Sequence, residues 1–186
     1  MSSKFLILYS TTDGHTVEIC RRIQGFIEAD GHAVTIRELT PNTDIDLSPF
    51  DRVVIGASIR YGKNKPEVKR FIDAQQTALE QKSAALFSVN AVARKPEKLT
   101  PETNPYVKKF LASISWKPAT IGIFGGKIDY PIYGFVDRTM IRFIMWMTKG
   151  PTDPTGTFEF TDWKAVERFA GELTAKAPAP DGTSQQ

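Results

Sequence analysis

An unbroken apolar run followed by small hydroxyl residues is the feature that most constrains the fold of this chain. Phe5–Tyr9 has the length of a strand, and consecutive apolar residues suit a strand that is buried on both faces of a parallel sheet. After the loop Ser10–Thr16, apolar residues recur at helical spacing between Ile19 and Ile27. The sequence therefore predicts a buried strand that ends in a hydroxyl-rich loop and leads into a helix.

That loop has the composition of an anion site. Its hydroxyl groups would converge with free backbone N–H groups and with the positive end of the helix dipole. The loop contains no lysine and no GxGxxG pattern, which argues against a P-loop and against a dinucleotide-binding turn. A hydroxyl-rich loop without a cation suits one terminal phosphate monoester, and FMN carries one; an ordinary capped turn would have the same pattern.

Strand-like and helix-like segments alternate about five times along the chain. Further strands are expected at His32–Glu38, Asp51–Ser58, Ser83–Asn90 and Thr120–Gly126, and helices at Gly14–Asp30, Pro66–Leu79, Tyr106–Ile114, Gly134–Lys149 and Asp162–Ala175. This alternation predicts an α/β fold, a doubly wound parallel sheet with helices on both faces. Residues 1–175 are expected to form one domain, and residues 176–186 a disordered tail.

The composition agrees with one such domain. The chain has 186 residues, of which 41% are hydrophobic and 24% charged, and a net charge of only +3. Its single cysteine, Cys20, lies on the apolar side of the first helix, which fits a reducing, cytoplasmic location. No stretch resembles a signal peptide or a membrane span, and no Cys, His or carboxylate spacing indicates a metal site. We also expect no nucleic-acid partner.

Three polar loops should meet at one edge of this sheet. In doubly wound sheets, ligands bind outside the carboxyl ends of the strands, and loops 10–16, 58–64 and 90–96 all follow strands. The second loop carries Tyr61, which could cover one face of a planar ring; the alternative is a rim aromatic without ring contact. The sequence thus places hydroxyl groups and an aromatic side chain around one site.

Longer segments resemble a known family. They are Phe50–Gly62 (FDRVVIGASIRYG), Ser88–Lys98 (SVNAVARKPEK), Asp129–Pro131, Tyr133, Asp137–Ile141 and Thr161–Trp163. From Lys4 to about Ala175 the layout resembles flavodoxins, and these segments resemble the bacterial flavodoxin-like protoporphyrinogen IX dehydrogenases. The resemblance implies a flavodoxin-like five-stranded parallel sheet with a long insertion near strand five. It also implies FMN as cofactor, oxidation of protoporphyrinogen IX in haem biosynthesis, and menaquinone or ubiquinone as electron acceptor.

The resemblance also implies the cofactor-binding residues. The FMN phosphate would be held by Ser10, Thr11, Thr12, Asp13, Gly14, His15 and Thr16. The ring would be flanked by Ser58, Ile59, Arg60, Tyr61, Gly62, Asn90, Ala91, Val92, Ala93 and Arg94. No aromatic residue occurs between Ala91 and Pro105, where many flavodoxins stack a tyrosine, so one face of the ring should be more open.

The loops expected around the ring are basic. They contain Arg60, Lys63, Lys65, Arg94, Lys95, Lys98 and Lys127. Positive charge stabilises an anionic reduced flavin and suits a substrate with carboxylates, although any one of these groups could be solvated surface charge. The candidate substrate-binding residues are Arg60, Arg94, Lys95, Lys127 and Tyr130. No catalytic residue outside the flavin is expected.

The segment Phe135–Lys149 combines a broad apolar arc with a basic stripe of Arg138, Arg142 and Lys149. About fifteen helical residues rise roughly 22 Å, which is too short to cross a bilayer. The pattern is typical of an interfacial helix, and the alternative is a core helix packed on the sheet. We expect it to attach the protein peripherally to the cytoplasmic side of the inner membrane.

Two other functions are compatible with this fold. One is a flavodoxin-type electron carrier without its own substrate, against which the basic loops and the extra helix argue. The other is an interaction module that lacks a flavin, since fold alone does not determine function.

Overall fold

The structure is a computed structural model that describes residues 2–175, so the expected tail at 176–186 lies outside the described residues. Five parallel strands form the central sheet in the order β2-β1-β3-β5-β6. Their bounds are β1 Lys4–Ser10, β2 Ala33–Glu38, β3 Arg52–Arg60, β5 Ala85–Asn90 and β6 Thr120–Gly125. The chain leaves β1 for β2 on one side and later continues with β3 on the other. This is the strand order of a flavodoxin-like sheet, with its switch point between β1 and β3.

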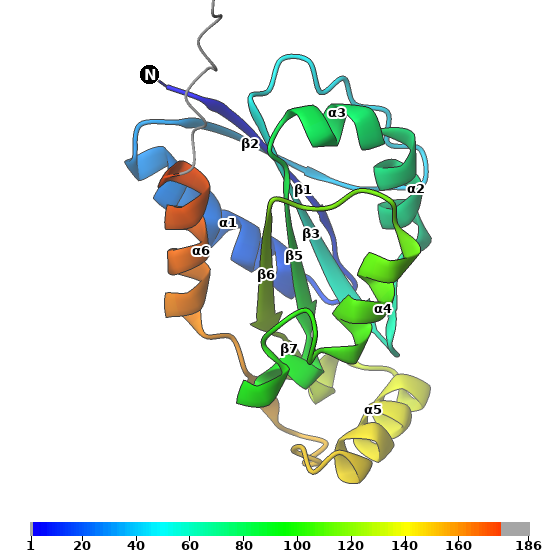
Figure 1. The fold of residues 1–186 in the computed structure, drawn as a ribbon. Coiled ribbons are helices and arrows are strands. Elements are labelled where there is room, and N and C mark those ends of the chain that lie inside the picture. Colours follow the sequence, from blue (N-terminus) through cyan, green and yellow to red (C-terminus); the bar gives the residue numbers. More distant parts are fainter. Residues whose placement is uncertain (1, 176–186) are drawn as a thin grey trace, which may run out of the picture.

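Helices cover both faces of this sheet (Figure 1). On one face lie α1 His15–Ala29 and α6 Trp163–Ala175, and on the other α2 Pro66–Ala74, α3 Gln76–Gln81 and α4 Pro105–Ser113. The segment expected as one helix at Pro66–Leu79 is interrupted at Gln75, which has a non-helical backbone and separates α2 from α3. The doubly wound fold is confirmed.

Two apolar layers explain the unbroken run that opens the chain. Successive strand residues point to opposite faces, so Phe5 and Ile7 pack with α1 and α6, while Leu6 and Leu8 pack with α2 and α3. The side chains of all four residues are at most 1% exposed. A strand with two buried faces has no position for a polar residue until it ends, and β1 ends at Ser10.

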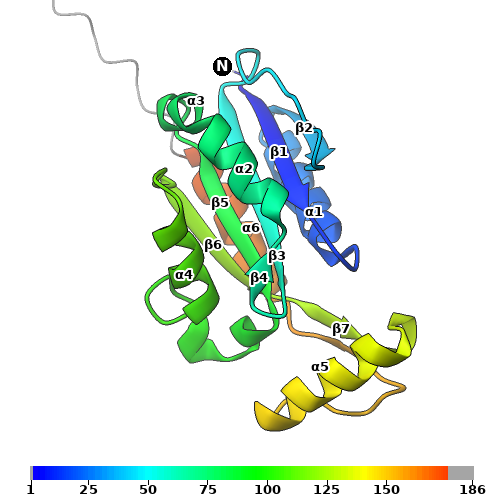
Figure 2. The ribbon, with the colours of Figure 1, turned by 90° about the vertical axis from the view of Figure 1, so that its right-hand side faces the viewer.

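A long insertion separates β6 from α6. It contains β7 Lys127–Asp129, the short 3-10 turn η3 Tyr130–Ile132, α5 Phe135–Met147 and β8 Thr157–Glu159, which pairs antiparallel with β7. Figure 2 shows α5 beyond the carboxyl ends of the strands rather than against either face of the sheet. The insertion predicted near the fifth strand is therefore present, and its helix lies at the edge where ligands bind.

β3 extends further than the sequence indicates. Ile59 and Arg60 belong to the strand, and Tyr61 and Gly62 form a tight turn to the short antiparallel strand β4 Lys63–Asn64. Both turn residues have positive φ, 51° at Tyr61 and 74° at Gly62. This hairpin carries Arg60 and Tyr61 beyond the end of the sheet.

Gly56 provides a test of the core packing. A Cβ on Gly56 of β3 would overlap the ring of the fully buried Phe87, so Gly56→Ala should destabilise the protein by about 1–3 kcal/mol. Gly25→Ala is the matched control, because Gly25 lies in α1 with open space around it, and should stabilise by about 0.5–1 kcal/mol. Urea unfolding measures both. Equal stability of the two variants would contradict this account of the core.

Candidate functional site

A cavity of about 500 Å³ lies between the carboxyl ends of the strands and α5. This volume is in the range of small-molecule sites. Most of the residues predicted to bind a cofactor line it: Thr11, Thr12, Asp13, His15, Thr16, Ser58, Ile59, Arg60, Tyr61, Gly62, Asn90, Ala91, Val92 and Arg94. The three loops predicted to meet at this edge of the sheet do so.

Three predicted residues do not line the cavity. Ser10 is buried at the end of β1. Gly14 allows the backbone of the loop to turn into α1 but does not itself line the cavity. Ala93 packs with Val107 and Ile123 in a small cluster beneath the third loop. A direct cofactor contact stays a prediction for these three residues, and for the residues that line the cavity as well.

The loop after β1 turns sharply into α1. Gly14, the N-cap of the helix, has φ 84°, a left-handed conformation that favours glycine. Its N–H donates to Thr11 Oγ1 at 3.0 Å, and its carbonyl accepts from the Val17 N–H at 3.2 Å. Because the first N–H groups of a helix have no partner within the helix, this turn presents donors to the cavity. The arrangement is that of an anion site.

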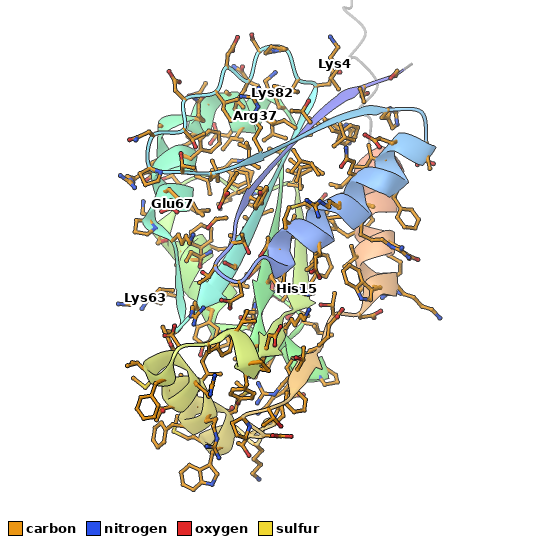
Figure 3. All side chains as sticks on the ribbon, turned by 180° about the vertical axis from the view of Figure 1, so that it is seen from behind. Lys4, His15, Arg37, Lys63, Glu67 and Lys82 are labelled. Atoms are coloured by element: carbon orange, nitrogen blue, oxygen red, sulfur yellow. The ribbon has the colours of Figure 1, made fainter. Side chains whose placement is uncertain are left out.

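His15 connects this loop to the base of the insertion. Its ring is buried, with Nδ1 at 3.0 Å from Glu18 Oε2 and Nε2 at 2.6 Å from Thr161 Oγ1. The Thr161 hydroxyl donates in turn to the carbonyl of Gly125 at 2.8 Å. Gly125 and Thr161 flank the insertion, and Figure 3 shows His15 at the start of α1, on the side that faces it. His15 is thus held as a structural residue of the loop.

Two buried hydroxyl groups at this edge lack a partner. Ser10 Oγ, at the end of β1, and Ser58 Oγ, near the end of β3, make no hydrogen bond within the described residues. An unsatisfied buried hydroxyl costs about 1–3 kcal/mol, so a partner from outside the chain, such as a ligand or a water molecule, is expected at each of these groups. One lies at the predicted phosphate end and one at the predicted ring end. The residues present therefore fit a phosphate-bearing flavin.

Arg60 lies at the centre of a cluster of charges and rings. Its Nη1 donates to Asp13 Oδ1 at 2.5 Å, and its Nη2 is 2.9 Å from Asp137 Oδ2. Its guanidinium lies over two rings, 5.4 Å from the centroid of Tyr61 and 5.1 Å from that of Tyr133. Burial lowers the pKa of Arg60, but Asp13, Tyr61 and Asp137 outweigh burial and raise it. The guanidinium remains charged and is shared between the phosphate loop and α5.

Arg94 holds the other end of α5. Its Nη1 donates to the Ala91 carbonyl at 2.9 Å, and its Nη2 donates to the carbonyl and hydroxyl of Thr148, at 2.8 and 3.0 Å. Burial lowers the pKa of this guanidinium. Thr148 is the C-cap of α5, where a cation also stabilises the negative end of the helix dipole.

The other three candidate substrate-binding residues differ in position. Lys127 lines the cavity and has no ion pair within the part of the chain that the structure describes. Lys95 lies outside the cavity lining. Tyr130 is also outside it, fully buried, with its hydroxyl donating to the Pro151 carbonyl at 2.8 Å. A ligand in this cavity could reach Tyr130 only if the cluster beneath α5 opened.

Several lining residues were not among the predicted ones. Tyr106, at the start of α4, approaches Gly62, where a Cβ would lie 3.0 Å from the tyrosine ring. It directly follows the stretch without aromatics at 91–105, so the aromatic missing from that loop lies one residue beyond it. Tyr133 also lines the cavity, and burial raises its pKa to about 12. The remaining roof comes from α5: Met140, Ile141, Phe143, Ile144, Met145 and Met147.

The described residues contain no group of His, Cys, Asp or Glu side chains that could hold a metal ion. Among them, no helix combines the length and apolar character needed to cross a bilayer. The site consists of hydroxyl groups, helix N–H groups, aromatic rings and cations around an apolar cavity.

Comparison with known proteins agrees with this geometry. The family model described as flavodoxin domain matches residues 6–155. Among solved structures, oxidised flavodoxin 1 from Bacillus cereus superposes with a TM-score of 0.55, at 14% identity over 95% of this chain and 100% of that one. Fold and site together define a flavodoxin-like protein of the flavin-binding class, and the chain belongs to the flavodoxin domain family.

Curated relatives show to which group within the flavodoxin domain family the chain belongs. A Leishmania major protein named protoporphyrinogen IX dehydrogenase (quinone) is 42% identical over 176 residues, which cover 94% of this chain and 76% of the relative. The protein of the same name from Escherichia coli strain K12 is 40% identical over 177 residues, 95% of this chain and 98% of the relative. Within the flavodoxin domain family, the chain belongs to the protoporphyrinogen IX dehydrogenase group.

The unpartnered hydroxyl group of Ser10 gives a test of how this buried group affects the stability of the flavin-free protein. In the flavin-free protein, Ser10→Ala should leave the free energy of unfolding unchanged or raise it by about 1 kcal/mol, because a desolvated hydroxyl is removed. Ser88→Ala is the control: Ser88 Oγ accepts from Asn90 Nδ2 at 3.2 Å, and its loss should cost about 1 kcal/mol. Urea unfolding compares them. Equal destabilisation of both variants would show that Ser10 is satisfied without a ligand.

Proposed function

We propose that this protein oxidises protoporphyrinogen IX to protoporphyrin IX in haem biosynthesis, with FMN as cofactor and menaquinone or ubiquinone as electron acceptor. The observation that carries the proposal is the identity of 40–42%, over about 95% of the chain, with relatives named for this reaction. Each pair of electrons and protons removed from the porphyrinogen reduces one quinone to a quinol.

The chain's residues fit FMN at both ends of the site. The loop Ser10–Thr16 would hold the phosphate on hydroxyl and N–H groups, and Ser58–Gly62 and Asn90–Arg94 would flank the ring. Bound FMN supplies the two-electron redox chemistry. The protein positions the reactants, excludes water with the apolar side chains of α5, and places cations near the ring.

Positive charge near the ring would favour reduction of the flavin and binding of an acidic substrate. Arg60, Arg94 and Lys127 line the cavity, and Lys127 has no carboxylate partner among the described residues. A cation that is not neutralised stabilises an anionic reduced flavin and can pair with a propionate of the porphyrinogen. Lys127 is therefore the residue best placed for substrate recognition.

The roofed cavity favours an enzyme over an electron carrier. A carrier needs only an exposed flavin edge, whereas here the side chains of α5 add an apolar wall to the cavity above the loops. An apolar wall suits contact with a tetrapyrrole and, after it leaves, with a quinone.

Anaerobic mixing tests the proposed reaction. Protoporphyrinogen IX added to the FMN-loaded protein should bleach the flavin absorbance and produce porphyrin fluorescence, and menaquinone should then restore the flavin absorbance. Lys127→Ala should raise the KM for porphyrinogen about tenfold, because one charge-assisted contact is lost. Lys164→Ala, in the exposed part of α6, is the control with unchanged KM. A flavin that stays oxidised would contradict the enzyme proposal and leave the carrier.

The outer side of α5 supports the proposed attachment to the cytoplasmic side of the inner membrane. Phe135 is 84% exposed, Val136 76% and Trp146 71%. The inner side of the same helix carries Ile144 and Met145 toward the cavity, so α5 is apolar on both sides. A helix of this kind is usually covered on both sides. Figure 3 shows ring side chains projecting from α5 away from the sheet.

The charges beside this surface suit anionic lipid. Arg142 and Lys149 are exposed on α5 and at its end, as an interfacial helix requires. Arg138 does not contribute in the same way, because its guanidinium donates to the carbonyls of Tyr130 and Tyr133 at 3.2 and 3.0 Å. The basic stripe predicted from the sequence is thus shorter than expected.

Vesicle sedimentation tests this attachment. The double variant Phe135→Ser, Trp146→Ser should bind vesicles of anionic phospholipid at least about 100-fold less tightly, since each buried aromatic side chain contributes about 1.5–3 kcal/mol. Phe26→Ser, which removes an exposed ring from α1, is the matched control and should bind as the unsubstituted protein does. Equal vesicle binding by all three proteins, or none by the unsubstituted protein at low salt, would contradict the attachment.

A further inference from the structure

Arg60 is the one guanidinium that bridges two carboxylates within the described residues. Asp13 belongs to the phosphate loop after β1, Arg60 to the end of β3, and Asp137 to the first turn of α5. These segments are far apart in the sequence and meet beside the cavity, which Asp13 and Arg60 line. We propose that Arg60 is a positioning residue that holds α5 closed over the flavin and couples this closure to occupancy of the phosphate loop.

The two ends of α5 are held differently. At the C-terminal end, Met145 is buried in an apolar cluster with Tyr130 and Tyr133, and Arg94 donates to the carbonyl of the C-cap residue Thr148. At the N-terminal end, Phe135 and Val136 are exposed. Asp137 joins the first turn of α5 to the β3 hairpin, and Arg138 joins the same turn to the carbonyls of Tyr130 and Tyr133. The helix is thus anchored at one end mainly by packing and at the other by polar contacts, of which only those of Asp137 reach the sheet edge.

Asp137 has two partners on the β3 hairpin. Its Oδ2 lies 2.9 Å from Arg60 Nη2, and its Oδ1 accepts from the Tyr61 hydroxyl at 2.5 Å. Tyr61 is the turn residue with positive φ, and its ring lines the cavity. The same carboxylate therefore fixes the position of α5 and the direction of the tyrosine that was predicted to cover the ring.

The coupling follows from the charge on Asp13. A carboxylate in a phosphate-binding loop repels the phosphate, and Arg60 neutralises it at 2.5 Å. Tyr133, at the other side of the guanidinium, also donates to Asp13, at 3.4 Å. When Arg60 stays on Asp13, it is also in reach of Asp137. Phosphate binding and closure of α5 consequently favour the same position of Arg60, and such linkage is reciprocal.

This proposal relies on FMN binding, which is part of the proposed function, but not on turnover. Two substitutions separate the two roles of Arg60. Asp137→Asn removes the negative charge of the carboxylate on α5 and leaves Arg60 paired with Asp13. Arg60→Ala removes both links and leaves Asp13 to repel the phosphate. Arg60→Lys can satisfy one carboxylate but cannot bridge two.

Hydrogen exchange and FMN titration provide the test. The first turn of α5 should exchange about tenfold faster in Asp137→Asn and in Arg60→Ala, with or without FMN, because a charge-assisted contact is lost. FMN affinity should fall about tenfold in Arg60→Ala, recover largely in Arg60→Lys, and change less than twofold in Asp137→Asn. FMN should slow exchange in α5 of the unsubstituted protein.

The control is Glu167→Gln, which removes a carboxylate 2.6 Å from Arg22 between α6 and α1, far from the cavity. It should alter neither α5 exchange nor FMN affinity. Unchanged α5 exchange in Asp137→Asn would overturn the proposal, and so would FMN affinity that is unaffected by Arg60→Ala. Because exchange is measured on flavin-free protein too, a failure of porphyrinogen turnover would refute the proposed function without deciding this one.

Discussion

Burial of the parallel sheet on both faces restricts polar groups to the ends of its strands. In β1 this restriction is complete: the residues after Lys4 are apolar up to Tyr9, and the first small polar residue is Ser10. Hydroxyl, N–H and guanidinium groups therefore gather at one edge, where parallel strands all end. The cavity, the loop predicted to bind phosphate and the position of α5 are consequences of this one arrangement.

The positive charge that the sequence places at this edge serves two different purposes. The guanidinium of Arg60 pairs with the carboxylates of Asp13 and Asp137, which neutralise it, whereas that of Arg94 donates only to neutral groups of Ala91 and Thr148. Lys127 has no such partner among the described residues. Counting basic residues in the loops overestimates the field at the ring, because paired cations contribute weakly. If a flavin binds as proposed, the field at its ring would come more from Lys127 and Arg94 than from Arg60.

The sequence predicts this fold well where local pattern and tertiary structure agree. The five strands and α1 follow from apolar runs and helical spacing, whereas the long insertion was implied by the family resemblance. The short strands β4 and β7 were not predicted. Two or three residues carry too little pattern, and the pairing of such strands depends on the hairpin and the insertion around them.

The site residues likewise divide into those predictable from the sequence and those whose position depends on tertiary packing. Loop residues at strand ends were predictable from topology, whereas Tyr106 enters the cavity only because Gly62 leaves room for its ring. Tyr130 has the chemistry of a ligand-binding residue, but its burial depends on how α5 packs over it.

The two interpretations of α5, a core helix and an interfacial helix, each describe one of its sides. Its inner side chains roof the cavity and its outer aromatic residues face solvent. If those outer residues enter a lipid surface as proposed, the cavity opens next to the bilayer in which a quinone dissolves. The first turn of α5, with Phe135 and Val136 exposed beside Asp137, would then bring the ion pair with Arg60 next to the lipid surface.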